Sequence, residues 1–138
     1  MYSHILIPVA LDHEAVLPAK IATARRLLAD GGRITLLTVL EDIPGFVAEF
    51  VTVSSENHLT AKIRGRLEEV ASDDAAISCD VITGKPGVAI VQYASANGVD
   101  MIVMGSHRPG IEDYFLGSTA ARVTRRAGCS VMVLRGDD

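Results

Sequence analysis

The stretch that decides the fold is MIVMGSHRPGIEDYFLGST, residues 101–119. Its first four residues are a continuous apolar run, and a segment bounded by Gly105 and Gly117 leads through Ser118 and Thr119 into a helical pattern over 120–127. Glycines let the backbone approach an anion closely, and the free N–H groups at a helix start point at that anion with the helix dipole behind them. The stretch therefore predicts a strand, a phosphate-binding loop and a helix in succession.

The rest of the chain alternates in the same way between continuous apolar runs and helical periodicity. The expected strands are residues 4–9, 34–40, 77–82, 100–104 and 129–134. The expected helices run from residue 17 to the stop signal Gly31-Gly32, from Ser55 to Val70, from Val88 to the stop signal Asn97-Gly98, and over 120–127. This alternation is typical of one α/β domain, residues 1–138, with a doubly wound parallel sheet and helices on both faces.

Two of these helices have a clear apolar face at a spacing of three or four residues. The first face consists of Leu17, Ile21, Ala24 and Leu28, and the second of Leu59, Ile63, Leu67 and Val70. The segment 41–54 is too apolar for a plain solvated loop, and three interpretations stay open: a lid, a contact surface or a short helical turn.

Composition and charge exclude several classes of protein. The formal net charge of −4 leaves no basic footprint, so a dedicated nucleic-acid binder is not expected. No apolar run approaches the ~20 residues that span a bilayer, and residues 1–4 lack the basic region of a signal peptide, so we expect a cytoplasmic protein without membrane contact. Cys79 and Cys129 lie in separate apolar runs and are expected as buried small hydrophobic side chains, and no His or Cys spacing indicates a metal site.

Two strand ends carry residues suited to binding a ligand. In doubly wound sheets, ligands bind at the carboxyl ends of the strands where the strand order reverses. Residues 8–12, PVALD, follow the first expected strand, and the loop from Gly105 follows the fourth. Together they predict a single crevice between the first and fourth strands.

Five segments of the chain resemble one known family. They are ILIPV at 5–9, GKP at 84–86, DMIVMGSH at 100–107, GSTA at 117–120 and CSVMVL at 129–134. The chain resembles the universal stress protein family essentially from end to end. The resemblance implies a five-stranded parallel sheet of order 3-2-1-4-5, as in the adenine-nucleotide alpha-hydrolase-like group. It also implies a homodimer, often formed through the last strand, here residues 129–135.

The resemblance further implies that the ligand is an adenine nucleotide, ATP or AMP, which can carry Mg²⁺ with it. The positions that match phosphate-holding groups of the family are Gly105, His107, Gly117, Ser118 and Thr119. Pro8 and Val9 match the strand end that lines the adenosine, and Val39 matches the residue beside adenine. The other residues expected to bind the nucleotide are Ala10, Asp12, Met104, Arg108 and Gly110.

The chain departs from the family pattern in two places. Arg108, followed by Pro109, stands where the pattern has its second glycine, and the glycine-to-glycine spacing is one residue shorter. Ala10 stands where family members usually carry an acidic residue that holds ribose hydroxyls, and Asp12 lies two positions further on.

Several of these residues have two interpretations that the sequence leaves open. Arg108 offers a planar fork of donors to phosphate, or it is a solvated loop side chain. Asp12 contacts ribose or Mg²⁺, or it caps the first helix. His107 braces its loop through hydrogen bonds or acts as a base, and Ser118 binds phosphate or is the N-cap of the last helix.

Three functions follow as hypotheses. The leading one is a cytoplasmic stress protein that binds ATP or AMP as a dimeric sensor or modulator, rather than a fast catalyst. Arg108, Pro109 and Ala10 favour a second, a nucleotide-free member that acts through protein contact only. The third is a slow ATP hydrolase, although no GxSxG motif and no clear base for activating water are present. Phosphate release that disappears in Ser118→Ala would indicate the third.

Overall fold

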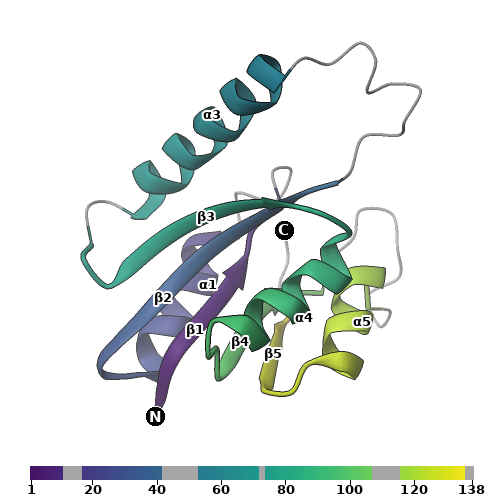
Figure 1. The fold of residues 1–138 in the computed structure, drawn as a ribbon. Coiled ribbons are helices and arrows are strands. Elements are labelled where there is room, and N and C mark those ends of the chain that lie inside the picture. Colours follow the sequence, from purple (N-terminus) through teal and green to yellow (C-terminus); the bar gives the residue numbers. More distant parts are fainter. Residues whose placement is uncertain (11–16, 42–52, 72–73, 107–115, 136–138) are drawn as a thin grey trace.

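A computed structural model describes residues 1–10, 17–41, 53–71, 74–106 and 116–135 (Figure 1). Its strands are β1 (Tyr2–Pro8), β2 (Leu28–Leu40), β3 (Ile77–Thr83), β4 (Met101–Gly105) and β5 (Ser130–Leu134). Its helices are α1 (Leu17–Leu27), α3 (Val53–Ala71), α4 (Pro86–Ala96) and α5 (Ser118–Arg126). The strands form one five-stranded sheet in the order β3-β2-β1-β4-β5, and each neighbouring pair is parallel. The expected fold class and strand order are confirmed.

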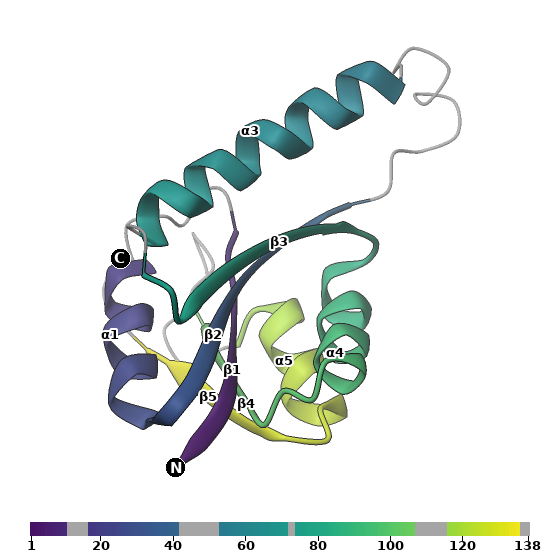
Figure 2. The ribbon, with the colours of Figure 1, turned by 60° about the vertical axis from the view of Figure 1, so that its left-hand side comes forward.

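Helices cover both faces of the sheet, with α1 and α3 on one side and α4 and α5 on the other (Figure 2). The core on the α1 side includes Ile5, Ile7, Leu17, Ile21 and Val103. The core on the α4 side includes Leu6, Ile90, Ile102, Met104 and Val123. Because alternate residues of a strand face opposite sides, a strand covered on both faces must be apolar throughout, which explains the continuous runs in β1 and β4.

The junction between α1 and β2 differs from the expectation. Gly31 and Gly32 do not end the helix, because α1 already ends at Leu27 and the next residue opens β2. The pairing of β1 with β2 shifts between Tyr2↔Leu28 and His4↔Arg33, so two steps along β1 correspond to five along β2. Gly31 lies within this irregular stretch with φ 76°, a conformation that glycine adopts at little cost. The glycines therefore lie in a bulge of β2 and do not form a helix terminus.

The apolar face expected for the second helix is partly wrong. Ile63, Leu67 and Ala71 form the buried row of α3, at a spacing of four residues. Val70 is one residue off this row and is 38% exposed. Leu59 lies one turn before Ile63, toward the helix start, and is 48% exposed. The register that buries Ala71 carries Val70 toward solvent.

The stop signal at the end of α4 is confirmed, and the helix begins at Pro86, two residues before the expected Val88. Lys85 is the N-cap and Pro86 lies in the first turn, where its missing N–H costs no helical hydrogen bond. Asn97 is the C-cap and donates its backbone N–H to the carbonyl of Tyr93, and Gly98 follows with φ 66°. A glycine in the left-handed region is a common way to end a helix.

A polar cluster joins the amino ends of β1 and β4 to the middle of β2. The Asp100 carboxylate accepts hydrogen bonds from the backbone N–H groups of Ser3 and His4, at 2.9 and 3.0 Å. His4 is 5% exposed, and its Nε2 lies 2.8 Å from the hydroxyl of Thr35. Partial burial alone would raise the pKa of Asp100, but these hydrogen bonds outweigh it and lower the pKa. The cluster holds the central strands in register at the edge opposite the strand ends discussed below.

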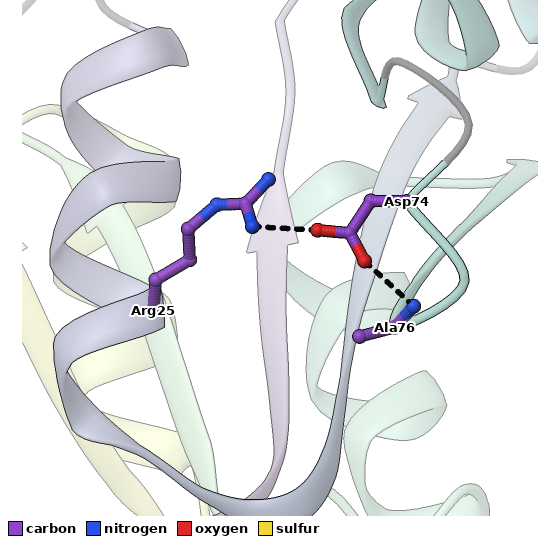
Figure 3. Close-up of polar contacts among 3 residues, drawn as sticks. All are labelled: Arg25, Asp74 and Ala76. Carbon is purple, nitrogen blue, oxygen red and sulfur yellow. Dashed lines mark hydrogen bonds and ion pairs between the residues drawn. The ribbon is translucent and has the colours of Figure 1, made fainter.

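An ion pair ties α1 to the turn before β3 (Figure 3). Arg25 donates to the carboxylate of Asp74, and the same carboxylate accepts the backbone N–H of Ala76 at 2.9 Å. The bond from Ala76, followed by that from Arg25, lowers the pKa of Asp74. This contact fixes the end of α1 that lies away from the predicted binding edge.

Both cysteines are free and half-buried. Cys79 packs against the core on the α1 side and Cys129 against the core on the α4 side. Burial raises the pKa of both thiols, so they stay neutral near pH 7 and behave as small apolar side chains. The helices within the described ranges are all too short or too polar to cross a membrane.

Candidate functional site

The carboxyl end of β1 is held against β2 by two hydrogen bonds around Val9. The N–H of Val9 donates to the carbonyl of Leu37 at 2.7 Å, and the hydroxyl of Thr38 donates to the carbonyl of Val9 at 3.0 Å. Val9 is 6% exposed and Thr38 is 2% exposed, so both bonds are shielded from water. Pro8 is half-buried beside them and Ala10 is exposed. The structure thus fixes the backbone at which the sequence predicts adenosine contacts.

The strand order reverses between β1 and β4, as the crevice hypothesis requires. Within the described chain, the pairing of these strands runs over Ile5↔Met101 and Leu6↔Ile102 and stops there. The last residues of β1 and β4 therefore do not pair with each other. Ligand sites of open α/β sheets form at such a point.

The end of β4 also carries the start of α5. The N–H of Ser106 donates to the carbonyl of Leu134 in β5 at 3.2 Å, and the N–H of Gly117 donates to the carbonyl of Ser106 at 3.3 Å. Ser106 is 7% exposed, so this junction is packed. The two segments predicted to hold phosphate, Gly105 and Gly117–Thr119, are thereby brought together.

The start of α5 leaves donors available for an anion. Gly117 is the N-cap, with φ −63° and ψ 159°, and as a glycine it offers no capping side chain of its own. The interpretation of Ser118 as N-cap is therefore wrong: Ser118 is the first helical residue and is exposed, and Thr119 is half-buried. The first N–H groups of a helix have no partner within it and lie at its positive end, which favours an anion. The hydroxyls of Ser118 and Thr119 belong to the same first turn of the helix.

Two further predicted residues serve mainly the core. Met104 is 5% exposed and belongs to the core on the α4 side. Val39 is half-buried, pairs with Ile82 of β3 and packs against the same core. Of the two, Val39 retains exposed surface at the carboxyl end of β2, beside β1.

Lys20 of α1 lies at this edge too, although it is not among the residues that the sequence predicts. It is 7% exposed, and a Cβ at Gly105 would lie 3.4 Å from its Cε and 3.5 Å from its Nζ. One signal in the sequence points to it: Lys20 follows Leu17 by three residues and precedes Ala24 by four, so a charge stands within the buried stripe of α1.

The remaining predicted site residues lie outside the described residues. They are Asp12, His107, Arg108 and Gly110. Of the segment 41–54, for which three interpretations stay open, residues 42–52 also lie outside them, and residues 53 and 54 belong to α3. Across the ranges that are described, no group of three or more His, Cys, Asp or Glu is placed to hold a metal ion.

The family model and the known relatives both identify the same family. The model of the Universal stress protein family matches residues 1–135. Universal stress protein G of Escherichia coli O157:H7 is 31% identical, over 98% of this chain and 100% of the relative.

Solved structures share the fold. The structure of the hypothetical protein MJ0577, from Methanocaldococcus jannaschii, superimposes with a TM-score of 0.80 at 24% identity, over 100% of this chain and 99% of that one. A universal stress protein crystallised in complex with cAMP superimposes with a TM-score of 0.64 at 18% identity, over 99% of both chains.

Proposed function

Because this chain belongs to the universal stress protein family, we propose that it binds an adenine nucleotide, ATP or AMP, and acts as a cytoplasmic sensor or modulator. The observation that carries the proposal is the junction between β4 and α5. There the bond from Gly117 to Ser106 holds the open start of a helix against the end of a strand. An anion placed at this start gains hydrogen bonds from backbone N–H groups and a favourable dipole.

The phosphates are proposed to lie over Gly105 and the start of α5, with the hydroxyls of Ser118 and Thr119 as further donors. The adenosine is proposed to lie along Pro8, Val9 and Val39, at the ends of β1 and β2. The family member in complex with cAMP supports an adenine ligand, since cAMP is an adenine nucleotide. Ala10, Asp12, His107, Arg108 and Gly110 remain predicted contacts from the sequence, and Mg²⁺ would arrive with the phosphates.

The test of this function is nucleotide identification followed by calorimetry. Freshly purified protein is denatured, and any released nucleotide is identified by mass spectrometry. The emptied protein is then titrated with ATP, AMP, adenosine and GTP. We expect heat with ATP or AMP and much less with GTP. Absence of released nucleotide together with absence of heat for both adenine nucleotides would contradict the proposal.

A second function is favoured by one observation at the end of β1. Ala10 is exposed where family members usually carry an acidic residue, so this position offers no carboxylate to ribose. A chain that has lost its nucleotide would act by protein contact alone. The same titration separates the two functions, because only the first predicts adenine-dependent heat.

We also propose that the chain forms a homodimer through β5. This strand is at an edge of the sheet, and its residues 131–134 are apolar but only half-buried. An edge strand with unpaired backbone groups and apolar side chains is suited to pairing with a second copy. Sedimentation equilibrium should give twice the chain mass, and Val133→Lys should shift it toward the monomer. A monomeric wild-type protein at all concentrations would exclude this dimer.

A further inference from the structure

The two edge strands of the sheet, β5 at one end and β3 at the other, differ in their chemistry. An edge strand presents a row of unpaired backbone N–H and C=O groups, to which a strand of another molecule can add. β5 is apolar over residues 131–134, whereas β3 carries Asp80 in its middle, beside Arg64 of α3. The two edges therefore offer different surfaces to an incoming strand.

The hydrogen bonds to β2 identify the backbone groups of β3 that face outward. The carbonyl of Ala76, immediately before β3, and the N–H of Gly84, immediately after it, both bond to β2, at 2.7 and 2.8 Å. The N–H and C=O of one residue point to the same side of a strand, and those of the next residue point to the other side. The even-numbered residues of β3 therefore face β2, and Cys79 and Val81 direct their backbone groups away from it.

The carbonyl of Cys79 and the N–H of Val81 already have side-chain partners. Nη1 of Arg64 donates to the carbonyl of Cys79 at 3.3 Å, and the N–H of Val81 donates to Oδ1 of Asp80 at 2.9 Å. An added strand would need the same two groups, because its N–H would donate to the carbonyl and its C=O would accept from the N–H. A guanidinium and a carboxylate thus take the places of the backbone groups of a neighbouring strand.

Arg64 and Asp80 reach this edge from opposite faces of the sheet. Cys79 and Val81 pack against the core on the α1 side, where α3 also lies (Figure 2), so the side chain of Asp80 faces the α4 side. There, burial and the nearby Asp80 carboxylate raise the pKa of Tyr93 in α4. Nη2 of Arg64 lies 3.5 Å from Oδ1 of Asp80. The ion pair therefore passes around the edge of β3 and covers it.

We propose that Arg64 and Asp80 close the β3 edge to a second copy of this chain, so that copies pair through β5 alone. A chain with two open edges would add copies at both ends, whereas one closed edge limits the assembly to a dimer. The limit to a dimer rests on the β5 pairing of the proposed function, but the closed edge is tested separately from it. The two side chains are 43% and 36% exposed, and exposed ion pairs contribute little to stability, so the fold should survive their removal.

The test removes both side chains in Arg64→Ala/Asp80→Ala, which leaves the net charge unchanged. Arg26→Ala/Asp30→Ala is the matched control, because both of these residues are exposed and belong to α1 and β2. A third variant adds Val81→Pro to the first pair, since proline lacks the outward N–H and closes the edge again while the bonds to β2 remain. Circular dichroism and urea unfolding establish that each variant is folded, and sedimentation equilibrium then compares the masses over a wide range of concentration. Asp80→Ala alone replaces the double variant if the latter does not fold.

We expect the wild type and the control to have the same mass, and Arg64→Ala/Asp80→Ala to form species of at least about twice that mass. Addition of Val81→Pro should restore the wild-type mass. An unchanged mass in Arg64→Ala/Asp80→Ala, an equal rise in the control, or a rise that Val81→Pro does not reverse overturns the closed edge and leaves the β5 dimer standing. A monomeric wild type whose double variant is dimeric supports the closed edge and overturns the β5 dimer.

Hydrogen exchange gives the same answer if the proline variant does not fold. The Val81 amide of Arg64→Ala/Asp80→Ala should exchange slowly in the larger species, where an added strand accepts its hydrogen bond, and rapidly in dilute protein. Rapid exchange in both would overturn the closed edge.

Discussion

The backbone N–H of Gly117 donates to the carbonyl of Ser106 over 3.3 Å, and this bond closes the segment between β4 and α5 at its base. It places the end of the strand and the start of the helix together, whatever the residues between them do. The predicted phosphate site therefore has a fixed base formed by backbone groups. Substitutions of side chains leave this backbone hydrogen bond in place.

Removing the exposed hydroxyl at the start of α5 should weaken phosphate binding. Ser118→Ala deletes one donor to a charged group, and such a bond contributes about 1.5–3 kcal/mol, so the Kd for ATP should rise roughly tenfold or more. Binding of adenosine should not change. Titration calorimetry measures both, with Ser95→Ala on the exposed surface of α4 as the matched control. An ATP affinity equal to that of the control would remove Ser118 from the site.

The buried hydroxyl of Thr38 should contribute to stability through Val9. Thr38→Val keeps the shape but leaves the carbonyl of Val9 without its 3.0 Å hydrogen bond, at a cost of about 1–3 kcal/mol. Thr124→Val is the control, because its hydroxyl donates to the carbonyl of Ala120 at an exposed position where water replaces it. Urea unfolding compares the two. If both variants lose the same free energy of unfolding, burial does not increase the contribution of the Thr38 hydrogen bond to stability.

Stability should fall below neutral pH because of His4. Burial lowers its pKa from the usual 6.5 and the nearby Arg33 adds to this, while the carbonyl of Asn97 and the charge of Asp100 oppose it. The folded state then binds fewer protons at His4 than the unfolded state does. The contribution of His4 to the free energy of unfolding is therefore complete above about pH 6.5 and declines as the pH falls below that value. Urea unfolding at pH 7.5 and 5.5 measures the decline.

Two variants separate His4 from other titrating groups. His4→Gln should lower stability at both pH values but flatten the dependence between them. His58→Gln, at an exposed position of α3, should retain the wild-type dependence. A pH dependence that survives unchanged in His4→Gln would assign the effect elsewhere.

Gly87 should be required for the packing of α4 on α5. A Cβ at this position would lie 2.6 Å from Cδ of Arg122 and 3.2 Å from its Cβ and Cγ. Gly87→Ala should therefore destabilise the wild-type protein, although alanine favours the helix by about 1 kcal/mol. In an Arg122→Ala background the contacts with Cδ and Cγ are absent and only the 3.2 Å contact with Cβ remains, so the same change should destabilise the protein less than it does in the wild type. Additive effects in this double-mutant cycle, measured by urea unfolding, would contradict the contact.

The fold was predictable because both faces of the sheet are covered. Continuous apolar runs at 4–9 and 100–104 are typical of strands buried on two sides, and they became β1 and β4. The errors arose where a local signal has two readings. Gly31 can end a helix or sit in a bulge, and the pairing of Leu28 with Tyr2 decides for the bulge. Val70 is apolar, but the packing of Ala71 decides which row of α3 is buried.

The candidate site was predictable where backbone groups form it. The sequence singles out Gly105 and Gly117 because glycines and a helix start leave a pattern along the chain, and the structure brings these two positions close together. Lys20 is not singled out in this way, because its relation to Gly105 depends on the packing of α1 against β4 and not on spacing. Thr38 was missed for the same reason, since its partner Val9 lies in another strand.

The most direct test of the account is to follow backbone amide signals of ¹⁵N-labelled protein by NMR during titration with ATP. We predict the largest shifts at Gly105, Ser106 and Gly117–Thr119, with smaller shifts near Val9 and Val39. The amides of Ser3 and His4 at the opposite edge should not move. Absence of shifts at saturating ATP, or shifts confined to residues away from the ends of β1 and β4, would contradict the account.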